Sequence, residues 1–195
     1  MSASHTTKLP VWLGLILAWP VLVFRRLKFG YSFRKIYLGD GFWTIVDPAD
    51  YHWIGKFKWI YWGGGKNNYA VGELKIGHKK TKKVYMHRLI MRAPKGKLVD
   101  HGNGDGLDNR RANLRLATRS QNMMNRSKTK KKTSSRYIGV CFDKGCKRWR
   151  AAIRVRHKQR HLGSFKSEIA AACAYDNAAR KYHKEFARLN FPEDT

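Results

Sequence analysis

Residues Val99–Asn122 of the chain read VDHGNGDGLDNRRANLRLATRSQN, and they combine acidic, histidine and asparagine side chains with several glycines. The apolar residues before Asp100 and the run ANLRLA beyond the glycines favour two short strands that pair as a hairpin. The next segment, SQNMMNR, starts with a helical pattern that would return Asn122 to the hairpin. This stretch therefore predicts a small hairpin and helix that gather polar side chains.

The composition favours a folded protein with a polyanionic partner. Of the 195 residues, 43% are hydrophobic and 13% are aromatic, which is too rich for a disordered chain. The 41 Lys and Arg residues against 13 Asp and Glu residues give a formal net charge of +28, so the self-repulsion must be offset by a polyanion. Nucleic acid is the first candidate for that partner, and an anionic membrane surface is the second.

The three cysteines show no spacing that is typical of a metal site or a redox pair. Cys141, Cys146 and Cys173 give an odd count without a C-x-x-C pair or a histidine pair at zinc spacing. Reduced thiols of this kind favour an intracellular protein, either cytoplasmic or nucleoid-associated.

The first thirty residues form an apolar extension of uncertain role. The uncharged run Leu9 to Phe24 has sixteen residues, which as a helix would rise about 24 Å against a bilayer core of about 30 Å. Pro20 interrupts the run and the basic residues RRLK follow it directly, which disfavours secretion. We expect an extension that packs on the domain, and membrane contact or a membrane tether through Leu9 to Phe24 is the less favoured alternative.

The acidic cluster has three interpretations. A calcium loop would need carboxylates at its first and twelfth positions, where this chain has His101 and Ala112, so that interpretation is excluded. A structural loop, in which Asp105, Asp108 and Asn109 satisfy the backbone of turns, stays open. It does not explain an imidazole directly after an acid at the end of a strand.

The third interpretation is hydrolysis of phosphodiester bonds. A nuclease needs a divalent cation that shields developing charge and a base that takes a proton from water. Mg²⁺ takes few protein oxygens, so the Asp100 carboxylate with the Asn122 amide would suffice. An imidazole such as that of His101 is suited to accept a proton near neutral pH.

The C-terminal part follows the basic segment RSKTKKKTSS, which is expected to be a linker. In KRWRAAIRVR, the residues Trp149, Ala151, Ile153 and Val155 alternate with arginines, which predicts a strand with an apolar face and a guanidinium face. A helix over residues 167–184 would cover the apolar face. We expect the opposite face to contact DNA, and a merely solvated face is the alternative.

This segment resembles the AP2 DNA-binding domain through YIGV, WRAAIR, HLGSF, AAACAYDNAARKYH and LNFP. The resemblance implies a three-stranded antiparallel sheet in the major groove with one helix behind it. His161 replaces the tryptophan that is usual there, so the target sequence does not carry over. The expected DNA-binding residues are Arg148, Arg150, Arg154, Arg156, Arg160 and His161.

The acidic stretch and the region from about residue 36 resemble the HNH endonuclease family, in the subgroup of phage and intron homing enzymes. The matching segments are VDPADYHWIGKFKW, VYMHRLIM and VDHGNGDGLDNRRANLRLATRSQNMMNR. The resemblance implies His101 as the general base, Asp100 and Asn122 as metal ligands and Asn113 as the residue that braces the loop. His87 is also typical of the family, either as a packed histidine or in contact with substrate.

The expected fold class is α+β, with a ββα-metal HNH nuclease domain followed by an AP2-like three-stranded antiparallel sheet packed on one helix. The expected divisions are an extension over residues 1–30, the HNH domain over 31–125, a linker over 126–135 and the AP2-like domain over 136–195. The predicted function is a site-directed, homing-type endonuclease that acts on double-stranded DNA with Mg²⁺, or another divalent cation such as Mn²⁺. No obligatory protein partner is evident. The main rival is a transcription-factor-like DNA-binding protein with an inactive HNH scaffold.

Overall fold

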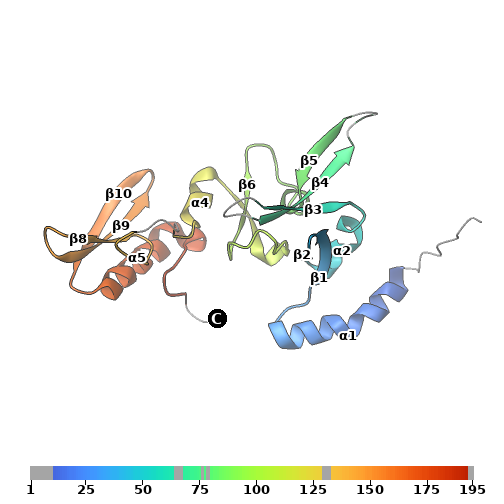
Figure 1. Cartoon of the computed structure of the whole chain (residues 1–195), viewed down its shortest axis with the longest axis horizontal. Coiled ribbons are helices and arrows are strands. Elements are labelled where there is room, and N and C mark those ends of the chain that lie inside the picture. The colour runs from blue at the N-terminus through green and yellow to red at the C-terminus, as the bar shows by residue number, and fades with distance from the viewer. Residues whose placement is uncertain (1–10, 64–67, 76, 78–79, 129–132, 193–195) are drawn as a thin grey trace, which may run out of the picture. The chain divides into compact units, whose positions relative to one another are not determined.

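The computed structural model describes residues 11–63, 68–75, 77, 80–128 and 133–192 of the chain. These residues form helices and small antiparallel sheets (Figure 1), which confirms the predicted mixture of α and β structure. The chain divides into two compact units, one from Met1–Ile90 with Gly106–Ala112 and the other from Met91–Asp105 with Asn113–Thr195.

The first unit contains a helix, a hairpin and a three-stranded sheet. Its elements are α1 (Val11–Phe29), β1 (Arg34–Gly39), β2 (Phe42–Val46), α2 (Pro48–Ile54), β3 (Trp59–Gly63), β4 (Asn68–Lys75), β5 (Thr81–Tyr85) and α3 (Met86–Ile90). Strands β1 and β2 pair as an antiparallel hairpin, and the order β3-β4-β5 makes an antiparallel sheet. Val46, Ile54, Val71, Met86 and Ile90 are buried in this unit and form its apolar core.

The loop Gly106–Ala112 packs on strand β2 of the same unit. Backbone hydrogen bonds join Ile45 N to Leu107 O at 3.0 Å and Asn109 N to Ile45 O at 2.8 Å. The Asn109 side chain is fully buried and donates to Thr44 Oγ1 at 2.8 Å. A residue pair more than sixty positions apart thus fixes this loop on the sheet.

Helix α1 contains Pro20, and its last turn carries basic residues. Leu9 and Pro10, the start of the apolar run considered for a membrane tether, lie outside the described residues. Of the helices in the part of the chain that the structure describes, none has both the length and the apolar character needed to cross a membrane. Trp19 and Leu27 on α1 are exposed.

The second unit contains a hairpin with a short helix and a three-stranded sheet with a long helix. Its elements are β6 (Leu98–His101), η1 (Arg111–Asn113, which begins in the first unit), β7 (Leu114–Ala117), α4 (Arg119–Met124), β8 (Val140–Asp143), β9 (Arg148–Val155), β10 (Lys158–Phe165), α5 (Glu168–His183) and η2 (Lys184–Phe186). The hairpin β6–β7 is antiparallel. Helix α4 starts with a capping box, because the side chains of Thr118 and Gln121 each accept a hydrogen bond from the backbone N–H of the other. Residues 129–132 of the predicted linker lie outside the described residues.

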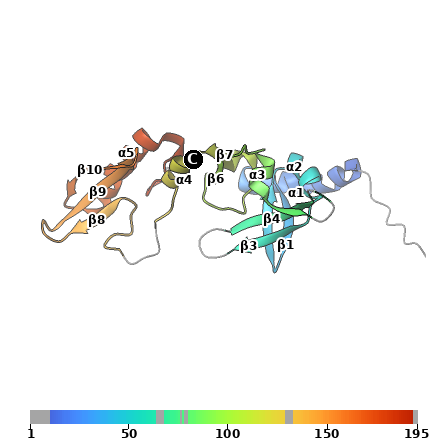
Figure 2. The same ribbon diagram turned by 90° about the horizontal axis from the view of Figure 1, so that it is seen from above.

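Helix α5 packs on one face of the sheet with the order β10-β9-β8 (Figure 2). Ala151 and Ile153 of β9 are buried and face the helix, which confirms the alternation predicted for this strand. Small residues of α5, such as Ala172 and Ala179, let the helix approach the sheet closely. Gly139 is required by this packing, since its φ is +73° and an added Cβ would lie 2.1 Å from the Tyr175 ring.

Candidate active site and basic sheet face

Strand β6 ends in two polar residues that are both buried. Asp100 pairs with Arg115 across the hairpin, and His101 pairs with Leu114. Asp100 and His101 are each only 6% exposed, so their polar atoms need partners within the protein. The end of strand β6 therefore carries an acid and an imidazole in succession, and both residues are shielded from water.

The Asp100 carboxylate is held by two side chains. Arg115 donates from Nε and Nη2 to Oδ2 at 2.8 and 2.6 Å, an ion pair with two hydrogen bonds. Asn125 Nδ2 lies 3.1 Å from both carboxylate oxygens. The guanidinium thus occupies Oδ2, and Oδ1 receives the longer and weaker contact from the Asn125 amide.

The backbone around His101 is fixed by hydrogen bonds from three directions. Its carbonyl oxygen accepts from Asn125 Nδ2 at 2.8 Å and from Gly104 N at 2.9 Å. Gly102 N donates to Asn113 O at 2.8 Å. Asn113 Oδ1 in turn accepts from Asn103 N at 2.9 Å, so this residue ties the loop after β6 to the start of β7.

Asn122 lies on α4, where its backbone N–H donates to Thr118 O at 3.0 Å. The side chain is half-buried. Asn122 precedes Asn125 by three positions, so the two residues lie on the same side of the helical turn. The amide that reaches Asp100 is that of Asn125, and Asn122 is positioned on the helix face next to it.

Sequence reasoning missed Arg115 and Asn125. The alternation of ANLRLA assigned Arg115 to a strand without showing that it would pair with Asp100 across the hairpin. Asn125 carried a weak signal, because it stands one helical turn beyond a residue already considered as a ligand.

The oxygen donors of this site are few. Among the residues that the structure describes, no three His, Cys, Asp or Glu side chains gather closely enough to hold a metal ion. A hard divalent cation can nevertheless use one carboxylate and one amide, with its other positions filled by water and phosphate oxygens. Asp100 supplies the carboxylate of such a set, with Oδ2 engaged by Arg115 and both oxygens contacted by Asn125 Nδ2.

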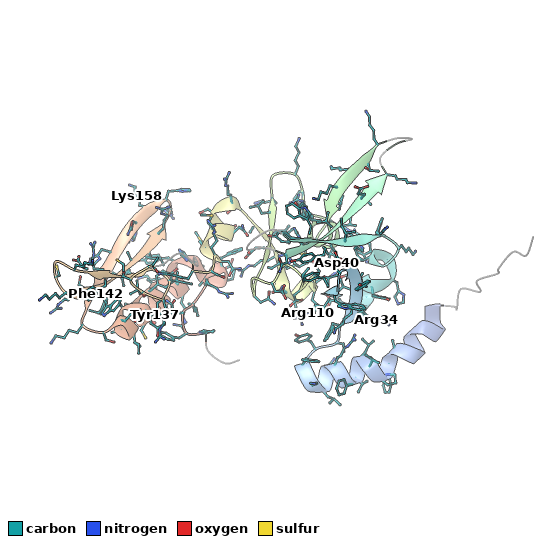
Figure 3. The ribbon with its side chains drawn as sticks, viewed as in Figure 1. Arg34, Asp40, Arg110, Tyr137, Phe142 and Lys158 are labelled. Carbon is teal, nitrogen blue, oxygen red and sulfur yellow. The ribbon has the colours of Figure 1, made fainter. Side chains whose placement is uncertain are left out.

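Two acidic residues of the first unit, Asp50 and Asp108, pair with arginines of the loop between β6 and β7. Asp108 accepts hydrogen bonds from Arg110 Nε and Nη2 at 2.8 and 2.6 Å, and this contact raises the pKa of Arg110. Arg110, labelled in Figure 3, also stacks over the Tyr31 ring at 3.4 Å. Asp50 accepts from Arg111 at 2.7 and 2.8 Å, and this hydrogen bonding raises the pKa of Arg111. The structural-loop interpretation therefore applies to Asp108 and to the buried Asn109.

His87 lies in the first unit among aromatic rings. Its ring centroid is 5.2 Å from that of Tyr69 and 5.5 Å from that of Tyr85, and the residue is 7% exposed. These contacts favour the interpretation of His87 as a packed histidine over one in contact with substrate.

The face of the sheet away from α5 is basic and exposed. Phe142 of β8 and Lys158 of β10, both labelled in Figure 3, pair with Trp149 and Val155 and so belong to the opposite, helix-side face. Cross-strand pairing sets Arg150 opposite Cys141 and His161 opposite Ala152. The predicted DNA-binding residues Arg148, Arg150, Arg154, Arg156, Arg160 and His161 are all exposed.

Neighbouring residues show on which face of the sheet Arg150 and Arg160 lie. Arg150 Nη1 lies 3.4 Å from Asp143 Oδ2, and the pKa of Asp143 is lowered chiefly by the backbone N–H of Cys146. Arg160 pairs with the buried Ile153 and lies 5.2 Å from the Tyr182 ring of α5. Cross-strand partners share a face, so Arg160 is on the helix side of the sheet, unlike Arg150.

The family model for HNH endonuclease matches residues 84–124, which include the buried Asp100 and His101, the hairpin and helix α4. The chain therefore carries an HNH endonuclease domain, and it belongs to one family with Protein 3.8 of Escherichia phage T7. The two are 34% identical over 96 residues, which are 49% of this chain and 78% of the phage protein.

Two further relatives match larger and smaller shares of the chain. The "Uncharacterized HNH endonuclease L560" of Acanthamoeba polyphaga mimivirus is 28% identical over 158 residues, which are 78% of this chain and 76% of that protein. The "AP2/ERF and B3 domain-containing protein Os01g0141000" of Oryza sativa subsp. japonica is 49% identical over 59 residues, which are 30% of this chain and 16% of the rice protein.

Proposed function

We propose that the chain is a site-directed, homing-type endonuclease that hydrolyses phosphodiester bonds of double-stranded DNA. The observation that carries this proposal is the adjacent burial of Asp100 and His101 at the end of β6, with the backbone of His101 fixed by hydrogen bonds from Asn125 and Gly104. The match of residues 84–124 to the HNH endonuclease family supports it.

Each residue of the site has a separate role. His101 takes a proton from the attacking water, which is the work of a general base. Asn113 braces the loop after β6 through Gly102 and Asn103, so it orients the imidazole rather than reacting.

Asp100 and Asn122 would hold a divalent cation, for which Mg²⁺ is the first choice and Mn²⁺ the second. HNH nucleases generally use such an ion. When bound, it supplies positive charge that stabilises the phosphate as negative charge develops on it. Arg115 keeps the Asp100 carboxylate in one orientation.

The C-terminal sheet is proposed to dock on DNA. Arg148, Arg150 and Arg154 of β9 supply guanidinium groups for phosphates and guanine edges, and His161 lies on the same face. Arg156 lies in the turn after β9 and would add a further guanidinium there. Arg160, at the helix side, is suited to the flanking backbone. The likeness of 59 residues to the rice AP2/ERF and B3 protein supports an AP2-like module.

The division of labour follows from these assignments. We assign residues 31–125 to cleavage, residues 126–135 to a basic linker along the phosphates and residues 136–195 to positioning on the duplex. Residues 1–30 are an extension, with membrane contact through Leu9 to Phe24 not favoured. The net charge of +28 suits a nucleic-acid partner, and the reduced cysteines suit an intracellular site of action.

A second candidate is a DNA-binding protein with an inactive HNH scaffold. The observation in its favour is the ion pair between Arg115 and Asp100, because a cation must share that carboxylate with a guanidinium. Cleavage assays separate the two candidates, since both predict binding to duplex DNA.

The test of the proposed function is the substitution His101→Ala. Loss of a general base lowers the rate by about 10² to 10⁴, so nicking of supercoiled plasmid with Mg²⁺ should almost disappear. Duplex binding should stay within a few-fold of wild type. His52→Ala, which removes a histidine on α2 outside this site, is the matched control. Mg²⁺-dependent nicking by His101→Ala at the wild-type rate would contradict the assignment.

A further inference from the structure

The segment that follows α5 contacts both halves of the second unit. It consists of η2 and the residues up to Phe191, and we refer to residues 184–191 as the strap. On one side the strap is tied to the sheet module. Asn190 N donates to Asp176 Oδ1 at 2.9 Å, and Ile138 N donates to Asn190 Oδ1 at 2.6 Å. Phe191 N also donates to Asp176, at 2.8 Å.

On its other side the strap contacts the β6–β7 hairpin. Arg115 donates from Nη1 to Glu185 O, and its guanidinium carbon lies 4.2 Å from the centroid of the Phe186 ring. Arg188 Nη1 donates to Asn103 O at 3.0 Å. The strap therefore meets both the ion-pair partner of Asp100 and the loop that follows His101.

Arg115 is unusual in the number of groups that fix it. Its Nε and Nη2 engage Asp100, its Nη1 engages the strap backbone, and one face of its plane covers Phe186, which is 5% exposed. A guanidinium held at three edges and one face loses its rotational freedom, so the carboxylate paired with it is held as well.

We propose that the strap couples the C-terminal sheet to the nuclease hairpin, and that Arg115 is the positioning residue through which it acts on Asp100. With Oδ2 fixed by Arg115, Oδ1, which also accepts from Asn125 Nδ2, is held in one direction. Removing the Phe186 ring would free the guanidinium and let the carboxylate and the loop after His101 move. This inference rests on the proposed function for its catalytic consequence, but the coupling itself is a structural property.

The test compares Phe186→Ala with Phe191→Ala in the full-length chain. Phe191 is a matched control because it lies in the same strap, while its ring packs on Tyr137 at 5.2 Å rather than on the hairpin. The first readout is hydrogen exchange at the amides of Gly102 and Gly104, which close the loop after His101. We expect Phe186→Ala to raise both exchange rates by about tenfold, because local opening of the loop becomes easier. Phe191→Ala should leave both exchange rates unchanged.

The second readout is the cleavage kinetics. Phe186→Ala should lower kcat by about tenfold with little change in KM for the duplex, because it disturbs positioning rather than binding. Phe186→Tyr keeps the ring and should restore kcat. Arg115→Lys keeps the charge but not the planar fork, and should behave like Phe186→Ala.

The two proposals fail in different ways. If wild-type protein cuts no duplex, the proposed function falls and the exchange comparison still decides the coupling. The Ala152 amide, which donates to Gly139 O inside the sheet module, reports whether a variant loosens that module as a whole. If its exchange also speeds up in Phe186→Ala, Arg188→Ala takes the place of Phe186→Ala in the comparison. Unchanged exchange at both loop glycines in Phe186→Ala and Arg188→Ala, or an equal effect of Phe191→Ala, overturns the coupling.

Discussion

Asn125 should be a stability residue, whereas Asn122, one turn earlier on the same helix side, should be a catalytic one. The Asn125 side chain donates to both Asp100 oxygens at 3.1 Å and to His101 O at 2.8 Å, and the residue is 7% exposed. Asn125→Ala therefore removes one hydrogen bond to a charged acceptor, worth about 1.5 to 3 kcal/mol, and one to a neutral carbonyl, worth about 0.5 to 1.5 kcal/mol.

The combined loss from these two hydrogen bonds in Asn125→Ala should lie at the lower end of the range that their energies span. His101 O keeps its hydrogen bond from Gly104 N, and Asp100 keeps the two from Arg115, so neither acceptor is left bare. The expected loss in the free energy of unfolding is about 2 to 3 kcal/mol. Asn125→Asp should cost more than Ala at neutral pH, because it sets a second carboxylate against Asp100 in a buried place.

The assay is urea unfolding of wild type, Asn125→Ala, Asn125→Asp and Asn122→Ala, followed by fluorescence and far-UV circular dichroism. Asn122→Ala removes the same amide from a half-buried position and should change stability by less than about 0.5 kcal/mol, while it abolishes Mg²⁺-dependent cleavage. The reasoning is refuted if Asn125→Ala unfolds at the wild-type midpoint, or if Asn122→Ala is equally destabilised and still cleaves.

Three further outcomes can be measured. Replacing Arg150 and Arg154 by Ala should weaken duplex binding by about 1 to 3 kcal/mol for each arginine that reads a base, and unchanged affinity in a gel-shift titration would assign that face to solvent. Burial, and then the charge of Asp176, raises the pKa of Tyr175 to about 12. The neutral Tyr175 hydroxyl therefore contributes fully to stability below pH ~10, and this contribution is lost as the pH rises toward 12. Tyr175→Phe should lack this alkaline loss when unfolding is measured against pH. Gly102→Ala should raise the free energy of unfolding by up to about 1 kcal/mol, because an added Cβ would meet Asn113 at 3.5 Å, an ordinary van der Waals distance, and a lower melting temperature would contradict that.

The local pattern of the sequence was sufficient to predict the element and its buried side chains where one face of that element is buried. The alternation of residues 148–155 predicted that Ala151 and Ile153 lie inside, and both are buried against α5. The hairpin over LVDH and ANLRLA was predicted from its short apolar runs, and β6 and β7 pair there in the expected antiparallel way. Periodicity works in these places because burial of one face fixes the register.

Long-range partners could not be predicted in the same way. The loop Gly106–Ala112 hydrogen-bonds with β2 although it lies between the strands of the hairpin in sequence. Arg115 looked like one more surface arginine in a chain with 41 Lys and Arg residues. Its role depends on cross-strand pairing with Asp100 and on packing against Phe186, seventy-one positions away.

The acidic residues of this polycation are few, and the structure gives several of them an arginine. Asp50 pairs with Arg111, Asp108 with Arg110 and Asp100 with Arg115. The first two pairs each join residues of the first unit, so their carboxylates serve to offset positive charge and hold a loop. Asp100 differs because it adjoins a fixed histidine and because its arginine is held from outside the hairpin by the strap. Arg110 is also held by a ring, that of Tyr31, but that ring lies in the same unit as the pair. The orientation of the Asp100 carboxylate, in contrast, depends on a segment seventy positions beyond Arg115 in the chain.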